Sequence, residues 1–228
     1  LSTYAHLLIQ EENKMKDSQI KQYASQLAAK YQDQLSKQHD VVLSITLNEK
    51  ALQNLMKDFK ALATERYSVR KFDSRPVEQE KLDILLEVAR LAPTAHNYQP
   101  QRLLVLNTTD SLNKLKDCTN GHFNTPLAII VCYDNAVSWK REYDDADMGV
   151  VDASIVGSHL MFTVADIGLG TTWIAHFDPS KVRAAYALPD NIIPVAIFPI
   201  GYPHPDCVPA PGHTKRFDVS DFTIYNSF

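Results

Sequence analysis

Apolar and polar positions recur along the chain with two periods, and these predict an alternation of helices and strands. Three-to-four spacing predicts helices at 13–37, from Leu52 to Leu62, and at 78–92, 147–167 and 179–187, with a short one around 111–117. Short apolar and β-branched runs predict strands at 40–47, 102–107, 127–134, 170–175 and 192–203. This alternation is typical of a layered α+β or α/β domain.

Two of these helices carry more specific expectations. In the helix at 78–92 we expect Leu82, Leu85, Leu86 and the stretch from Val88 to Leu91 to face inward, and Pro93 to end the helix. The helix at 147–167 is small and apolar nearly all round, which predicts burial on several faces.

The chain changes character near residues 48–60, where a charged helical segment gives way to the mixed pattern. We therefore expect a helical N-terminal arm over 1–49 and one domain over 50–228. A length of 228 residues suits a single core with an appendage.

Charge and cysteine content narrow the function classes. The net charge of -4 gives no global reason to expect nucleic acid or an anionic membrane as partner, and the longest apolar runs are too short to span a bilayer. Cys118, Cys132 and Cys207 are widely spaced, which predicts neither a disulfide framework nor a metal site. This cysteine usage fits a reducing, cytoplasmic setting, which is the localisation expected.

Candidate chemistry begins with the sequence RYSVR. Arg66, Ser68 and Arg70 occupy alternate positions, so an extended segment would point all three toward one face. Two guanidiniums flanking a hydroxyl can bind an anion. The alternative is an exposed, charged strand.

The turn APTAHNYQPQ, residues 92–101, holds an unusual number of polar side chains for a helix-to-strand connection. Asn97 and Gln99 each offer a paired donor and acceptor suited to the edge of a heterocycle. Alternatively, they bond the backbone of their own turn. His96 is interpreted as a bystander.

Two further stretches are weaker signals. In GLGTTWIAHFD, residues 168–178, the glycines suit a tight helix-to-strand turn but lack the spacing of a dinucleotide fingerprint, and no P-loop is present in the sequence. Lys215 and Arg216 form a basic pair that could bind an anion or simply be solvated.

Taken in order, these stretches resemble the FMN-dependent nitroreductase family. The motifs are ERYSVRKF, APTAHNYQP in place of A-P-S-x-x-N-x-Q-P, DMG, GLGTTWI, IGYP and a closing basic residue, and they cover about residues 50–228. The resemblance implies an α+β fold, a three-layer α/β/α sandwich with a central, mostly antiparallel sheet, in an intertwined homodimer. The two FMN sites would lie at the subunit interface, with the helix from Asp147 to Ile167 as the dimer core.

The resemblance also assigns site residues. Arg66, Tyr67 and Ser68 would lie by the phosphate and ribityl chain, and Arg70 by the pyrimidine edge, where it would stabilise reduced flavin. The other subunit would contribute its turn, and a strand end would place its backbone by flavin N5. Lys215 and Arg216 would bind the phosphate. The turn residues are Pro93, Thr94, Ala95, Asn97 and Gln99, and the strand-end residues are Trp173, Ile174, Ala175 and His176.

The activity implied is ping-pong hydride transfer from NAD(P)H to nitroaromatics, quinones or similar planar acceptors, with no catalytic side chain and no metal. Alternatives are a specialised flavoenzyme of the same fold, such as a dehalogenase or an oxidase, and a flavin-binding module without turnover. This chain departs from the family pattern at Ala175, where many relatives have glycine, at His176, which adds a side chain, and at Gln101, which replaces an aromatic residue.

Overall fold

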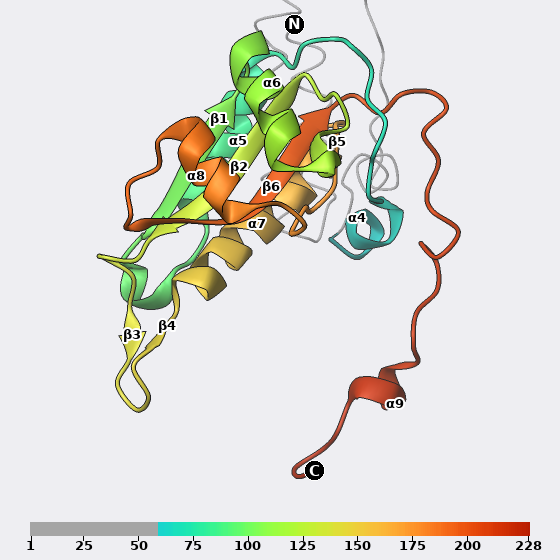
Figure 1. Ribbon diagram of the computed structural model, residues 1–228. Helices are drawn as coiled ribbons and strands as arrows, with labels where there is room; N and C mark the ends of the chain where they lie inside the picture. Colours follow the sequence, from blue (N-terminus) through green and yellow to red (C-terminus); the bar gives the residue numbers. More distant parts are fainter. Residues whose placement is uncertain (1–58) are drawn as a thin grey trace, which may run out of the picture. The chain divides into compact units, whose positions relative to one another are not determined.

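The computed structural model describes residues 59–228 (Figure 1). The arm, the strand at 40–47 and the start of the helix from Leu52 lie outside these residues. The chain divides into two compact units, and the second runs from Leu62 to Phe228. The described helices and strands are α4 (Phe59–Glu65), α5 (Gln79–Leu91), β1 (Gln101–Leu106), α6 (Thr109–Cys118), β2 (Leu127–Asp134), β3 (Lys140–Arg141), β4 (Ala146–Asp147), α7 (Gly149–Asp166), β5 (Gly170–Thr171), α8 (Pro179–Tyr186), β6 (Ile192–Gly201) and α9 (Val219–Phe222), with 3-10 turns at Ala95–Asn97 and Asn120–His122.

The central sheet has the strand order β1-β2-β6-β5, and every neighbouring pair is antiparallel. All eight residues of β2 are buried, because this strand has a neighbour on each side and helices over each face. Pro194 in β6 has no N–H to give to the ladder, and the pairing register with β2 shifts beside it, between Val131 and Cys132.

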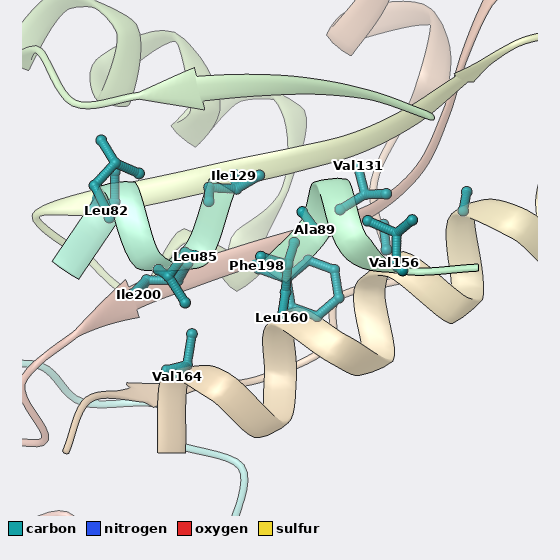
Figure 2. Packing of buried hydrophobic residues seen from close by; sticks show 14 of the residues in the cluster. Leu82, Leu85, Ala89, Ile129, Val131, Val156, Leu160, Val164, Phe198 and Ile200 are labelled. Atoms are coloured by element: carbon teal, nitrogen blue, oxygen red, sulfur yellow. The ribbon is translucent and has the colours of Figure 1, made fainter. Parts of the chain in front are cut away.

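The alternation of side chains along β2 divides the core into two clusters. Ile129 and Val131 pack with α5 and α7, whereas Ile130 and Cys132 pack with α6 and α8. Figure 2 shows side chains of α5 and α7 converging on Phe198 and Ile200 of β6. Helices thus cover both faces of an antiparallel sheet, and the predicted three-layer α/β/α sandwich is confirmed.

Most predicted elements within 59–228 are confirmed, including the short helix α6, which Thr108 caps by accepting from the backbone N–H of Ser111. The predicted strand at 170–175 is shorter than expected: after β5 it continues only as an isolated bridge between Ile174 and Ile197. The β3–β4 hairpin and α9 were not predicted, because strands of two residues and a helix of four leave no periodic signal.

One burial prediction is wrong for the single chain. Arg90 and Leu91 were expected to face inward, but both are exposed at the end of α5, Leu91 by 62%, because the inward stripe of that helix is Leu82, Leu85 and Ala89. Helix α7 is predicted to be buried on several faces. Most of its residues are buried or partly buried within one chain, and Val150 and Val151 are about half exposed. Among residues 59–228, no helix is long and apolar enough to cross a membrane.

Gly157 allows α7 to approach the sheet closely. A Cβ atom at this position would lie 2.7 Å from the ring of Trp173 and 2.9 Å from that of Phe198. We therefore expect Gly157→Ala to lower the free energy of unfolding by about 1–3 kcal/mol through overpacking, despite the higher helix propensity of alanine. Denaturant titration measures this, and Gly212→Ala, which has no atom within 4 Å, is the control. Equal stability of the two variants would contradict the packing described here.

Candidate functional site

The RYSVR segment begins at the end of α4, where the N–H of Arg66 donates to the carbonyl of Leu62 at 3.0 Å, and its middle pairs with β5. Ser68 forms a parallel bridge with Thr171, and the N–H of Val69 donates to the carbonyl of Thr171 at 3.0 Å. The side chain of Val69 is buried against Gly170. Because side chains alternate along extended backbone, burial of Val69 turns its neighbours Ser68 and Arg70 away from the core.

The two arginines of this segment have different environments. The guanidinium carbon of Arg66 lies 5.4 Å from the ring centroid of Phe162 in α7, and its Nε is buried without a hydrogen-bond partner among residues 59–228. Arg70 is exposed, and its Nη1 donates to the carbonyl of Ser68 at 3.3 Å. A buried, unpaired donor is costly, so an anion bound at Arg66 would satisfy a group that this chain leaves unsatisfied.

Tyr67 ties this segment to the chain that follows β6. Its hydroxyl donates to the carbonyl of Cys207 at 3.1 Å, its ring meets that of His213 edge-on at 6.3 Å, and burial raises the pKa of the phenol. Lys215 and Arg216 lie two and three residues after His213 and are exposed. The Nη1 of Arg216 donates to the carbonyls of His213 and Lys215 at 2.6 and 2.7 Å. The basic pair thus belongs to the segment that passes Tyr67.

The strand end at 173–176 offers backbone donors. Ile174 exchanges two 3.0 Å backbone hydrogen bonds with Ile197, and Trp173 packs its ring against Phe198 with centroids 5.0 Å apart. Ala175 and His176 are exposed, and within the described residues their N–H groups have no acceptor. Thr119 fixes this backbone, because its Oγ1 donates to the carbonyl of His176 at 2.7 Å. The N–H groups of Ala175 and His176, on a backbone that Thr119 fixes, are therefore suited to donate to an acceptor atom of a bound ring.

The polar turn between α5 and β1 has a strained backbone. His96, Asn97 and Gln99 have φ values of 51°, 56° and 51°, in the left-handed region that non-glycine residues rarely adopt. Thr94 supports the turn, because its Oγ1 accepts from the N–H of Gln99 at 3.0 Å. Strain of this kind persists only where neighbouring groups fix the backbone, and it concentrates at functional sites.

The side chains of the turn agree in part with the alternative interpretation, in which Asn97 and Gln99 bond the backbone of their own turn. Gln99 Nε2 donates to the carbonyl of Asn97 at 3.4 Å, so one amide is engaged within the turn. Asn97 is exposed. The ring of His96 lies 5.0 Å from that of Trp139, just before the β3–β4 hairpin, and 5.8 Å from that of Tyr98. The contact with Trp139 was not predicted, because the two residues lie more than forty positions apart along the chain.

Within one chain the structure does not bring the turn and the arginine segment together. Ala95 bonds Asp152, near the start of α7, whereas Arg66 packs on Phe162, ten residues further along the same helix. At a rise of about 1.5 Å per residue, the two anchor points lie about 15 Å apart along the helix axis. The candidate residues of one chain thus form two separate clusters.

Several known proteins are similar to this chain in sequence and structure. The family model for the nitroreductase family matches residues 63–128 and 115–202. A nitroreductase family protein from Clostridium difficile 630 superimposes with a TM-score of 0.71 at 38% identity, over 75% of this chain and 100% of that one. An FMN-dependent nitroreductase from Clostridium difficile R20291 superimposes with a TM-score of 0.60 at 27% identity, over 73% and 98%.

Sequence comparison agrees with the structural match. An NADH dehydrogenase from Thermus thermophilus is 25% identical over 67% of this chain and 90% of its own length. The family match spans well over half of the chain, and it includes both the arginine segment and the polar turn. The chain therefore belongs to the nitroreductase family.

Proposed function

We propose that this protein is an FMN-dependent oxidoreductase that uses NAD(P)H to reduce nitroaromatics, quinones or similar planar acceptors. The observation that carries the proposal is the Nε of Arg66, two residues before Ser68, which is buried and has no hydrogen-bond partner within residues 59–228. The FMN-dependent relative at 27% identity supports the choice of anion. When bound, FMN accepts a hydride from NAD(P)H and passes the electrons to a second acceptor.

The residues of this chain would bind and orient the cofactor. Arg66 and Ser68, with Lys215 and Arg216 from the tail, would hold the phosphate and ribityl chain. Arg70 is exposed and, within residues 59–228, its guanidinium bonds the backbone carbonyl of Ser68, so it could turn to the pyrimidine edge. The N–H groups of Ala175 and His176 would face the ring nitrogen at the reacting centre.

The same proposal requires a homodimer, in which the turn of one subunit completes the site of the other. The separation of the two clusters along α7 supports this arrangement, because neither cluster alone surrounds a ring. Apolar side chains left exposed by one chain also support it. They are Leu91, Val150 and Val151 on the helices, and Phe217, Phe222, Ile224, Tyr225 and Phe228 in the C-terminal segment.

A cytoplasmic setting fits this chemistry. Cys118, Cys132 and Cys207 are all free thiols, and the first two are buried. Burial raises the pKa of Cys132 to about 12, which keeps its thiol protonated and unreactive. The arm over 1–49 stays a prediction, because it lies outside the described residues.

Purification and spectroscopy test the proposed function. We expect a protein that carries the visible absorption of oxidised flavin, and we expect NADH or NADPH to bleach it in the absence of oxygen. Bound flavin that neither nicotinamide reduces would indicate a module without turnover. A full-length protein that binds no FMN would overturn the proposal. Light scattering at micromolar concentration tests the assembly, since a monomer that retains flavin would exclude a shared site.

Asn97 and His96 separate ring recognition from local packing. We expect Asn97→Ala to weaken FMN binding about 2- to 12-fold, the size of one neutral hydrogen bond of about 0.5–1.5 kcal/mol. His96→Ala should change affinity less, since its ring packs on Trp139 and is given no bond to the flavin. Fluorescence titration of FMN measures both. Equal losses would show that Asn97 does not face the flavin ring as proposed.

A further inference from the structure

Asp152 is a charged residue in an otherwise apolar stretch of α7. Its side chain is 1% exposed, and its Oδ1 accepts from the backbone N–H of Ala95 at 2.8 Å. Its Oδ2 is buried without a partner anywhere in the described chain. Residues of similar volume on either side of it, such as Val151 and Val156, are apolar.

This arrangement is a poor one for stability alone. A buried carboxylate with one unsatisfied oxygen costs free energy, and an apolar side chain of similar volume commonly stabilises such a site better. The first turn of α7 reduces the cost, because the positive end of the helix dipole favours an acidic group there. The cost that remains suggests that the carboxylate serves the group it bonds.

The group it bonds is the backbone of the polar turn. Ala95 immediately precedes His96 and Asn97, which are two of the three left-handed residues, and each left-handed residue costs about 1–3 kcal/mol. Thr94 fixes the far side of the turn through Gln99, and the ring of His96 packs on Trp139. Asp152 is the support that comes from the long helix. Its bond to Ala95 ties the start of the strained run to α7.

We propose that Asp152 is a positioning residue for cofactor recognition. It locks the turn at 94–99 in the strained conformation that presents Asn97 to the edge of the FMN ring, without touching the flavin itself. This inference rests on the proposed function and assigns it a further residue, one that lies beneath the turn and not on its surface.

Two substitutions separate the effect of the acceptor oxygen from that of the charge. Asp152→Asn keeps an acceptor for the N–H of Ala95, so we expect FMN affinity within about threefold of the wild type. Asp152→Leu removes the acceptor, and we expect affinity to fall about tenfold, the size of a lost hydrogen bond to a charged group. Asp166→Leu, at the exposed last residue of α7, is the matched control and should bind like the wild type. If the leucine variant does not fold, Asp152→Ala carries the same test without added bulk.

A double-mutant cycle with Asn97→Ala distinguishes positioning from general support of the fold. If Asp152 acts through Asn97, adding Asp152→Leu to Asn97→Ala should cost less than about threefold further, because the contact it positions is already absent. Additive losses, an asparagine variant as weak as the leucine variant, or an unchanged affinity in Asp152→Leu would each overturn the inference. Failure of the wild-type protein to bind FMN would instead overturn the proposed function, so the two failures are distinct.

Discussion

Alanine in place of Arg66 is expected to weaken FMN binding about 10- to 150-fold. Arg66 combines a guanidinium over Phe162 with a buried Nε that has no partner in the described chain, so a bound phosphate would supply its missing acceptor. Loss of a hydrogen bond to a charged group costs about 1.5–3 kcal/mol, and each 1.4 kcal/mol is a tenfold change in affinity. Fluorescence titration of the apoprotein with FMN measures the change.

Riboflavin sharpens this test, because it lacks the phosphate. Arg66→Ala should leave riboflavin affinity nearly unchanged while FMN affinity falls. Arg90→Ala removes an equally charged side chain that pairs with Glu87 on the exposed face of α5, and it should affect neither ligand. A parallel loss for FMN and riboflavin would place Arg66 at the ring or assign it a purely structural role.

Replacement of Arg70 by glutamine is expected to lower the midpoint potential of the bound flavin by about 30 mV. For a two-electron couple this shift corresponds to about 1.4 kcal/mol. The physical reason is that a positive charge at the pyrimidine edge favours the reduced, more negative form of the flavin over the oxidised form. Removal of the charge therefore destabilises the reduced form, while affinity for oxidised FMN changes less. Spectroelectrochemical titration gives the potential directly.

Arg66→Ala should show the opposite profile. A group bound to the phosphate contacts both redox forms equally, so the potential should move little although both forms bind more weakly. An unchanged potential in Arg70→Gln, or a larger shift in Arg66→Ala, would show that the two arginine roles are wrongly assigned, even though the family is right.

The sequence predicted what depends on local periodicity. Leu82, Leu85 and Ala89 recur at helical spacing, and β2, which is apolar up to its last residue Asp134, has the composition of a strand covered on both faces. These features are decided by short-range burial, which the order of residues records.

Other features depend on contacts between distant segments, which a single sequence does not record. The left-handed residues of the polar turn are held by Asp152, more than fifty positions later, and His96 rests on Trp139. An aspartate near the start of a mostly apolar helix is the sequence signal of this contact, because charged residues are seldom buried without a partner. The exposure of Leu91 and Val151 reflects surface that a single chain does not cover.

The central claim, a flavin site shared between two subunits, is tested most directly by mixing two defective subunits. Arg66→Ala damages the phosphate cluster and Asn97→Ala the turn, so each homodimer has two damaged sites. In a mixed dimer, one site receives both substitutions and the other receives neither. We predict that tagged, purified mixed dimers bind one FMN per dimer with wild-type affinity and reduce it with NAD(P)H at the wild-type rate per intact site. Mixed dimers whose two sites are both as weak as those of the parent homodimers would show that each site is built within one chain and would contradict the account.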